Sequence, residues 1–369
     1  MRKFTNSRRN LAIGAVTLTG ALALGACSGV EGAQGGSGAG GTADLQFASF
    51  LGPTTPQGAA MKSMFEEISE DEESGLSVET FWEGALLGAD EMLSGVAQGR
   101  SDIGYMTVQY TPGELPLSQA ATVPFQTEDW EAVETALNTM YEDDEAFNGE
   151  WQGNGVHVLT FTGTPASIYA TAEPLPDFES LAGQQVRATG YTANAVDAAG
   201  GNAVALQIGE VYEAIQRGLV EGYTTMLLDT APSLSLHEVA PHITDTGIGV
   251  YTMNVIFMNQ DAWESLSDEQ RQVLEDGIEA YHAEYRERLT EVEDESCQAH
   301  IDAGGGVTIW SDEDKQQWRD VVGESLIDMW KSDVEQAGGD AEAFYSTYSK
   351  LVEENPGELE TGMKRCANR

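Results

Sequence analysis

Basic residues are scarce in this chain, whose 369 residues include 18 Lys and Arg against 61 Asp and Glu, for a formal net charge of -43. This balance argues against a nucleic-acid partner, because phosphate binding depends on clustered Lys and Arg. It favours solubility and resembles the surface of a protein adapted to high salt. Between Ser101 and Gln270 the only Lys or Arg residues are Arg187 and Arg217, so each of them needs an explanation.

Long hydrophobic runs are also missing. No apolar stretch reaches the roughly 18 residues that a transmembrane helix needs, so we expect none in the mature protein. The remaining composition, 41% hydrophobic and 8% aromatic, is that of a folded protein. A length of 369 residues exceeds what one compact core usually covers, which makes two domains the expectation.

Motifs for catalysis and metal binding are absent or incomplete. The segment from His237 to His242 misses H-E-x-x-H by one residue, and Pro241 would break the helix that the motif needs. The D-T-G triplet at Asp245 resembles that of aspartic proteases, but their chemistry requires two such loops. There is no G-x-S-x-G motif and no P-loop, and the five His residues follow no ligand spacing. We therefore expect neither an enzyme nor a metal or cofactor site.

Cysteine is rare as well, with only Cys27, Cys297 and Cys366 in the chain. Disulfides persist outside the cell, so Cys297 and Cys366 could form one there. Two separate thiols are the alternative, since the sequence does not reveal whether the two Cα atoms lie at the spacing of about 4.4–6.8 Å that a disulfide requires.

Residues 1–27 read as a secretory signal, in which a basic head precedes an apolar core too short for a stable membrane span. The core ends in Leu24–Cys27 (LGAC), which resembles a bacterial lipobox, whose cysteine is lipidated and becomes the new N-terminus. An ordinary signal peptide with a chance cysteine is the alternative. The S-R-R triplet at Ser7 also resembles a twin-arginine export signal. The Gly-rich segment 28–43 is expected to be a flexible tether.

From residue 44 onward, strands and helices alternate in the pattern typical of parallel β-α-β units. A helix is expected to start at Thr127 as its cap, and a capping box at Ser267 predicts a second, long helix. The segment 248–258 reads as one nearly unbroken apolar strand, long enough to run between two domains. The other expected strands are 45–50, 76–82, 102–108, 156–161, 167–171, 184–188 and 306–310.

The positive side chains before Gln270 in the ordered region are candidates for binding a carboxylate, for which a planar guanidinium is best suited. Lys62 is expected on the outer side of a helix, Arg100 in a turn after a helix-capping Gly, and Arg217 at a helix end where it meets the dipole. Arg187 instead ends a strand, and ligands of α/β proteins bind beyond the carboxyl ends of strands. From the residues alone, Arg187 either binds a ligand or forms an ion pair with one of the many acids.

Three segments resemble the solute-binding proteins of TRAP (tripartite ATP-independent periplasmic) transporters, the dicarboxylate-binding DctP-like family 7. They are Glu79–Gly104 with its G-x-L-G run and terminal D-I, the P-F pair at Pro124, and Leu181–Gly222 with L-x-G-x-x-x-R followed by E-V-Y-x-A-I-Q-x-G-x-V-E-G. Their order along the chain matches the family, and the resemblance extends from about Leu45 to about Trp330.

The resemblance implies an α/β, two-domain, periplasmic-binding-protein-like (type II) fold with a hinge, built from parallel-rich mixed sheets flanked by helices. On this basis we assign 44–162 plus about 255–309 to domain I. Residues 163–254 plus about 310–369 are assigned to domain II.

The resemblance also implies where a ligand would lie. Arg187 would hold the ligand's carboxylate, and Gln207 and Ile208 precede a helix where the family lines its pocket. Asn254 lies at or near a polar contact of the family on the 248–258 strand. Trp82 and Tyr105 end strands near the expected cleft, with burial in the core as their alternative role.

Two departures from the family narrow the expected ligand. A second arginine that many acid binders carry is missing from Thr162–Pro165, and Tyr223-Thr224 stands where Gln-Glu is frequent. A monocarboxylate, a keto acid or a zwitterion therefore fits a single arginine better than a dicarboxylate or sialic acid.

The family implies a monomeric receptor that is anchored by lipid at Cys27 to the outer face of the cell membrane. It would capture a small organic acid by hinge closure and deliver it to the small and large permease subunits in the membrane. A receptor for a neutral ligand such as a sugar, and a secreted lipoprotein hydrolase, are the alternatives.

Overall fold

The computed structural model describes residues 42–369, all of which belong to one unit of the chain. The expected signal peptide 1–27 with its lipidation site Cys27, and the expected tether as far as residue 41, lie outside the described residues. Within the described part of the chain, no helix is both long and apolar enough to cross a membrane.

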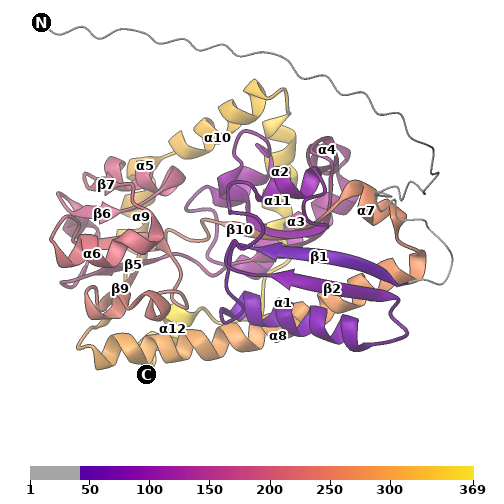
Figure 1. Ribbon diagram of the computed structural model, residues 1–369. Coiled ribbons are helices and arrows are strands. Elements are labelled where there is room, and N and C mark those ends of the chain that lie inside the picture. Colours follow the sequence, from indigo (N-terminus) through magenta and orange to yellow (C-terminus); the bar gives the residue numbers. More distant parts are fainter. Residues whose placement is uncertain (1–41) are drawn as a thin grey trace, which may run out of the picture. The chain divides into compact units, whose positions relative to one another are not determined.

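The first sheet has five strands in the order β2-β1-β3-β10-β4 (Figure 1). β1 pairs in parallel with β2 and β3, whereas β10 runs antiparallel to both β3 and β4. β10, the last strand of this sheet along the chain, therefore lies between two strands that come much earlier in the sequence. The strands are β1 Ala43–Ser49, β2 Leu76–Phe81, β3 Ile103–Thr107, β4 Val156–Gly163 and β10 Met253–Asn259.

The second sheet has six strands in the order β11-β9-β5-β8-β6-β7. β6 pairs in parallel with β7 and β8, while β5 runs antiparallel to β8 and β9. Both sheets are mixed and flanked by helices, which confirms the expected fold class. The strands are β5 Ile168–Thr171, β6 Gln185–Arg187, β7 Asn202–Val204, β8 Gly222–Met226, β9 His242–Asp245 and β11 Val307–Ile309.

Local signals account for the ends of the main helices. Thr55 caps α1 by accepting from the backbone N–H of Gly58, and Pro56 occupies the first turn, where its missing N–H costs nothing. Ser267 caps α8 in the predicted capping box with Gln270. The helices are α1 Pro56–Glu70, α2 Met92–Ala97, α3 Trp130–Asp143, α4 Glu145–Gly153, α5 Gly190–Ala198, α6 Val211–Gln216, α7 Gln260–Ser265, α8 Asp268–Asp302, α9 Asp312–Val322, α10 Ser325–Gln336, α11 Ala341–Glu354 and α12 Gly362–Ala367.

Helix α8 connects the surroundings of the two sheets. Near its start it packs against α1, and near its end it contacts α12 beside the second sheet (Figure 1). Its buried face includes Leu274, Tyr281, Tyr285 and Leu289, at the spacing of an amphipathic helix.

The start of α3 differs from the prediction that Thr127 is its cap. Asp129 is the N-cap and accepts from the backbone N–H of Ala132 at 3.0 Å. Thr127 accepts instead from the N–H of Asp129, at 3.0 Å, in the turn before the helix. Asp129 is the cap because its carboxylate suits the positive helix N-terminus better than the hydroxyl of Thr127 does.

The strand predicted at 248–258 is shorter than expected, because β10 begins only at Met253. Gly247 and Gly249 before it adopt the left-handed backbone, with φ of 74° and 81°. A Cβ at Gly249 would lie 2.4 Å from the carbonyl oxygen of Thr127, so the backbone approach there requires glycine. The apolar run is thus buried without being one extended strand.

Strand pairing and helix packing suggest adjustments to the proposed domain boundaries. Strand β11, which we assigned to domain I, pairs with β9 in the second sheet. Helix α11 packs against α3, and the indole N–H of Trp330 in α10 donates to the carbonyl of Pro116 at 2.9 Å. The C-terminal helices therefore return to elements of the first domain, and the division remains a proposal with these adjustments.

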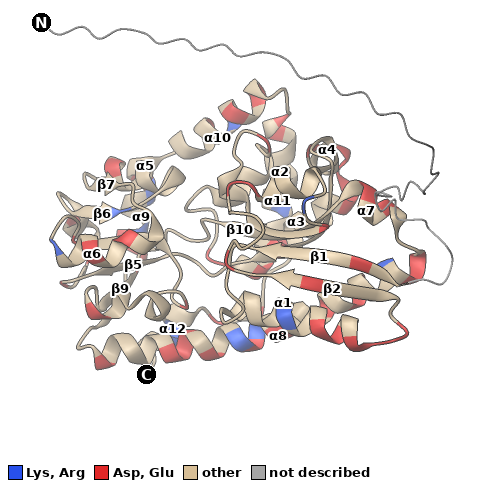
Figure 2. Ribbon diagram, viewed as in Figure 1, with Lys and Arg blue, Asp and Glu red and all other residues tan. Residues whose placement is uncertain are grey.

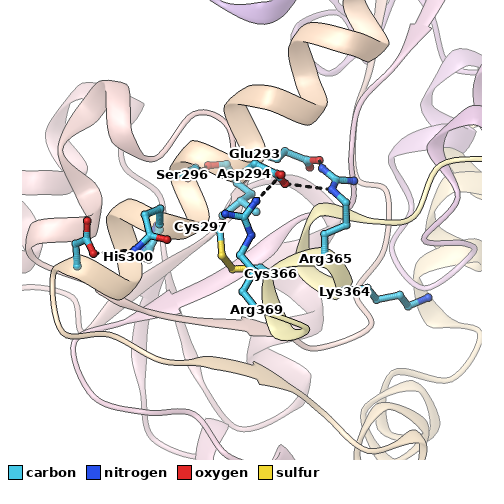
Figure 3. Close-up of a disulfide and its surroundings, with 12 residues drawn as sticks. Glu293, Asp294, Ser296, Cys297, His300, Lys364, Arg365, Cys366 and Arg369 are labelled. Atoms are coloured by element: carbon cyan, nitrogen blue, oxygen red, sulfur yellow. Dashed lines mark hydrogen bonds and ion pairs between the residues drawn. A yellow bond between two sulfur atoms is a disulfide. The ribbon is translucent and has the colours of Figure 1, made fainter.

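The structure joins Cys297 in α8 and Cys366 in α12 by a disulfide, with their Cα atoms 5.6 Å apart (Figure 3). Arg365, next to Cys366, forms ion pairs with Glu293 at 2.7 Å and Asp294 at 3.2 Å. The short C-terminal helix is therefore held on α8 by one covalent bond and by ion pairs.

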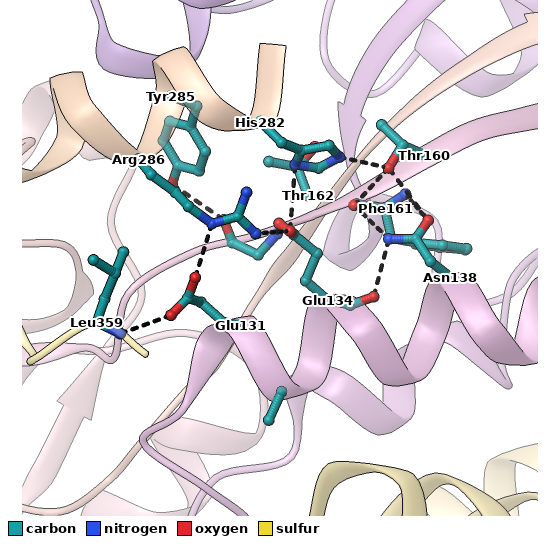
Figure 4. Close-up of polar contacts among 12 residues, drawn as sticks. Glu131, Glu134, Asn138, Thr160, Phe161, Thr162, His282, Tyr285, Arg286 and Leu359 are labelled. Atoms are coloured by element: carbon teal, nitrogen blue, oxygen red, sulfur yellow. Dashed lines mark hydrogen bonds and ion pairs between the residues drawn. The ribbon is translucent and has the colours of Figure 1, made fainter. Parts of the chain in front are cut away.

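A second buried network joins α3 to α8 (Figure 4). Arg286 of α8 donates to Glu131 at 2.8 Å and to Glu134 at 2.7 Å. Burial raises the pKa of Glu134 to about 7, and Arg286 lowers it in part. Glu131 also accepts from the backbone N–H of Leu359, which ties the segment before α12 to α3.

Candidate functional site

Arg187 is the last residue of β6 and is only 8% exposed. Its Nη1 donates to the hydroxyl and carbonyl oxygens of Thr225, at 2.7 and 2.9 Å, and its Nε donates to the carbonyl of Leu206 at 3.3 Å. Thr225 has a φ of 56°, an unusual value for a β-branched residue, and strain of this kind is often found at functional sites. The guanidinium is thus held in a fixed position at the end of the sheet.

No acid within residues 42–369 forms an ion pair with Arg187, although the chain is rich in acids (Figure 2). None of the ion pairs formed within residues 42–369 includes it, so the alternative of a structural ion pair is wrong. Its Nη2, which carries two of the five N–H donors, makes no hydrogen bond to any described residue. Burial lowers the pKa of the guanidinium, because a buried cation without a counterion is unfavourable.

Two tyrosines that sequence reasoning missed act on Arg187. The phenols of Tyr251 and Tyr110 raise its pKa and offset part of the effect of burial. Tyr251 is buried, and its carbonyl accepts from Gln109 at 2.6 Å. Tyr110, at the end of the short 3-10 helix 108–110, is 53% exposed. Neither belongs to the three motif segments that carry the family resemblance, and only the fold brings them to Arg187.

Tyr105 and Tyr110 are linked through one aromatic ring. The ring of Phe50 stacks on Tyr105 at 5.9 Å and meets the edge of Tyr110 at 6.0 Å. Tyr105 is fully buried in the first sheet, yet its hydroxyl has no hydrogen-bond partner among the described residues. This chain of rings extends from the first sheet to the tyrosine that acts on Arg187.

Gln207 and Ile208 follow Leu206, whose carbonyl accepts from Arg187. The carbonyl of Gln207 accepts from the backbone N–H of Glu210 at 3.0 Å, and the backbone N–H of Gln207 donates to the Glu210 carboxylate at 3.1 Å. Both residues are exposed, Ile208 to 46%, which is unusual for a large apolar side chain. Their link to Arg187 therefore runs through the carbonyl of Leu206, and both side chains lie at the surface.

Asn254 belongs to the first sheet, and Trp82 directly follows its strand β2. Asn254 is buried in β10 and accepts from the hydroxyl of Thr107 at 2.7 Å. Trp82 donates to Thr80 at 3.1 Å, and its ring packs on Phe47 at 5.2 Å. No described contact joins either residue to Arg187, so their place in one site with it remains a prediction. None of the six candidate residues lines the two cavities beside α12.

Asp229 is a further acid that sequence reasoning missed. It lies in the turn after β8 and is 7% exposed, and its Oδ1 is buried without a hydrogen-bond partner. Burial raises its pKa to about 6, and hydrogen bonds with its own backbone and Thr230 lower it in part. Its position beyond the carboxyl end of a strand is the signal that would have identified it.

The motifs excluded on sequence have structural roles. Asp245 forms an ion pair with Lys315 at 3.0 Å and accepts from the N–H of Gly247 at 2.9 Å. Nδ1 of His242 accepts from the backbone N–H of Gly306 at 3.0 Å. Among residues 42–369, no three His, Cys, Asp or Glu side chains are arranged to hold a metal ion.

Comparisons with known proteins agree on one family. The family model described as bacterial extracellular solute-binding protein, family 7 (DctP), matches residues 47–333, which is more than half of the chain. A similar relative is the ectoine-binding periplasmic protein TeaA of Halomonas elongata, 22% identical over 291 residues, which cover 74% of this chain and 85% of that protein.

Two solved structures share the fold. A TRAP periplasmic solute-binding protein from Desulfovibrio salexigens is 27% identical, with a TM-score of 0.75 over 86% of this chain and 98% of the other. A TRAP solute-binding protein of an unidentified marine microbe, specific for aromatic acids and solved with 3-hydroxybenzoate, is 23% identical. Its TM-score is 0.73, over 85% of this chain and 99% of the other.

Proposed function

The chain belongs to bacterial extracellular solute-binding protein family 7, and we propose that it captures its small organic acid through Arg187. Proteins of this family are the extracytoplasmic receptors of TRAP transporters, and this chain is one of them. The relatives support a receptor for an organic acid rather than a sugar receptor or a hydrolase. The observation that carries the proposal is a buried guanidinium without a counterion at the carboxyl edge of a parallel strand pair.

The free donors of Arg187 suit a carboxylate. Nη1 and Nε are occupied by protein oxygens, which orient the group, while Nη2 has no partner among the described residues. A ligand carboxylate would supply the missing negative charge in a buried setting, where a charged hydrogen bond is strong. Tyr110, whose phenol acts on Arg187, and Ile208 are both exposed, and the proposal is that the bound ligand covers them.

The mechanism that we propose is closure of the two domains on the ligand, with Gln207, Ile208, Asn254, Trp82 and Tyr105 completing its surroundings. Binding drives closure only to the extent that the ligand binds the closed state more tightly than the open one. Lipidation of Cys27 would keep the monomeric receptor at the outer face of the membrane, beside the small and large permease subunits.

The test begins with a melting-shift screen of organic acids, amino acids and sugars, followed by calorimetry on the best ligand. We expect Arg187→Ala to lower the affinity at least about thirtyfold, because removing one partner of a buried charged pair costs about 2 kcal/mol or more. The control is Arg217→Ala, since Arg217 is an exposed residue that pairs only with Glu213 of its own helix. An affinity change below tenfold in a folded Arg187→Ala protein would contradict the proposal.

A further inference from the structure

Among the described residues, four of the six buried charged side chains are paired. Among residues 42–369, the buried Asp, Glu, Lys and Arg side chains are Glu134, Arg187, Asp229, Asp245, Glu293 and Lys315. Glu134 pairs with Arg286, Glu293 pairs with Arg365, and Asp245 pairs with Lys315, at 2.7 to 3.0 Å. Only Arg187 and Asp229 in this set form no ion pair. Because an unpaired buried charge is strongly unfavourable, this exception needs a physical reason.

The two unpaired residues lie at the same edge of the second sheet. Arg187 ends β6, which pairs in parallel with β8 in the register Arg187↔Tyr223. Thr225, near the end of β8, accepts from Nη1 of Arg187, and the chain reaches Asp229 four residues later. The topology therefore brings a buried cation and a buried anion to neighbouring strand ends, yet the two do not pair with each other.

The surroundings of these two groups are phenolic. Asp229 raises the pKa of Tyr105 and Tyr285, in addition to the larger effect of burial. The Tyr251 hydroxyl is affected by both charges: burial raises its pKa most, Arg187 lowers it, and Asp229 raises it. Tyrosine rings are also favourable surroundings for an organic cation.

Tyr105 and Tyr285 differ in what their hydroxyls already bind. Tyr285 donates to the carbonyl of Gly163 and accepts from Gln57, each at 3.1 Å. The hydroxyl of Tyr105 and Oδ1 of Asp229 are both buried without a partner among the described residues. One hydroxyl and one carboxylate oxygen are therefore free to bind a donor of the ligand.

We propose that Arg187 and Asp229 hold the two ends of a zwitterionic ligand, with Arg187 on its carboxylate and Asp229 on its cationic nitrogen. This inference rests on the proposed function, since it uses the same Arg187 site, and adds the charge of the ligand's other end. Each buried charge then acquires its counterion from the ligand, which explains why the protein provides none. The same arrangement disfavours a dicarboxylate, whose second anion would face Asp229.

The test compares zwitterions with acids of the same skeleton that lack the cation, such as proline with cyclopentanecarboxylate and leucine with 4-methylpentanoate. Binding to the full chain is measured by calorimetry, first with the unmodified protein. We expect a zwitterion to bind at least about thirtyfold more tightly than its matched acid, because the acid leaves Asp229 unpaired. Equal affinities, or tighter binding of the acids, would overturn the inference.

The variant Asp229→Asn separates this role from a structural one. We expect it to weaken zwitterion binding at least about thirtyfold and to leave the matched acid unchanged or bound more tightly. Glu173→Gln, which alters an exposed acid whose carboxylate makes no described contact, should change neither. A parallel loss of both ligands in Asp229→Asn would contradict the assignment.

Outcomes for Arg187 distinguish the two proposals. Suppose that simple acids bind, that Arg187→Ala abolishes this binding, and that zwitterions bind no more tightly. In that case the proposed function stands, and the role of Asp229 is refuted. If Arg187→Ala leaves the affinity of every ligand within tenfold, both proposals fail.

Discussion

Loss of the disulfide between Cys297 and Cys366 should lower the free energy of unfolding by about 4 kcal/mol. The bond joins residues that are 69 positions apart and closes a loop that includes β11 and helices α9, α10 and α11. For a loop of this length, the chain-entropy relation gives about 15 cal/mol/K, or about 4 kcal/mol at 25 °C. Opening the loop lowers the free energy of unfolding because the unfolded chain gains conformational entropy.

The native position of α12 should survive this loss. Met363 and Cys366 lie in the apolar cluster of the second sheet, and Arg365 remains paired with Glu293 and Asp294. The backbone N–H groups of residues 357–359 also donate to carboxylates of α3 and its cap. These contacts do not depend on the disulfide, so the native structure is expected to stay the same.

The assay is urea unfolding of Cys297→Ser/Cys366→Ser in a chain that also carries Cys27→Ser, with Cys27→Ser alone as the control. The midpoint should fall by roughly 1 M, given an m-value above about 3 kcal/mol/M for a chain of this size. Hydrogen exchange should remain slow in α12. An unchanged midpoint, or rapid exchange confined to α12, would refute the reasoning, because the loss would then be absent or local.

Three further predictions concern the buried ion network and the membrane anchor. Arg286→Met should destabilise the protein by about 3 kcal/mol in thermal or urea unfolding, because it leaves the buried carboxylate of Glu134 unpaired. Because the pKa of Glu134 is raised, the stability that this group contributes is present below pH 4.5 and is lost as the pH rises to about 7. The melting temperature should therefore fall over this pH range, and it should fall less in Glu134→Gln. If the two proteins lose melting temperature equally from pH 4.5 to 7, Glu134 is not the group responsible. Cys27→Ser should move the protein from the membrane fraction to the soluble fraction, and retention in the membrane would argue against lipidation at this residue.

Much of the fold could be predicted because its signals are local. The cap of α8 at Ser267 and the proline at the start of α1 act within one helical turn, so a short window of sequence contains the cause and the effect. The alternation of apolar strands and helices likewise predicts mixed α/β sheets. The cap of α3 was misplaced by two residues, because two neighbouring side chains, Thr127 and Asp129, compete for that role.

The candidate site was only partly predictable. The position of Arg187 at a strand end and its scarcity among acids could be read from the sequence. Its lack of a counterion could not, because that depends on 61 acids whose distances are set by the fold. Its strongest partner, Thr225, is 38 residues away, and the tyrosines at 110 and 251 come from segments beyond any local pattern.

By itself, then, the sequence determined the family, the alternation of elements, the start of α8 and one cation at a strand end. The tertiary structure alone decided that Arg187 is buried without a paired acid among the described residues, that Asp229 is buried and unpaired in the turn after the neighbouring strand, and that Cys297 and Cys366 are joined. The physical reason is the range of the interactions: capping acts over three or four residues, whereas desolvation and ion pairing depend on every group that folding brings close.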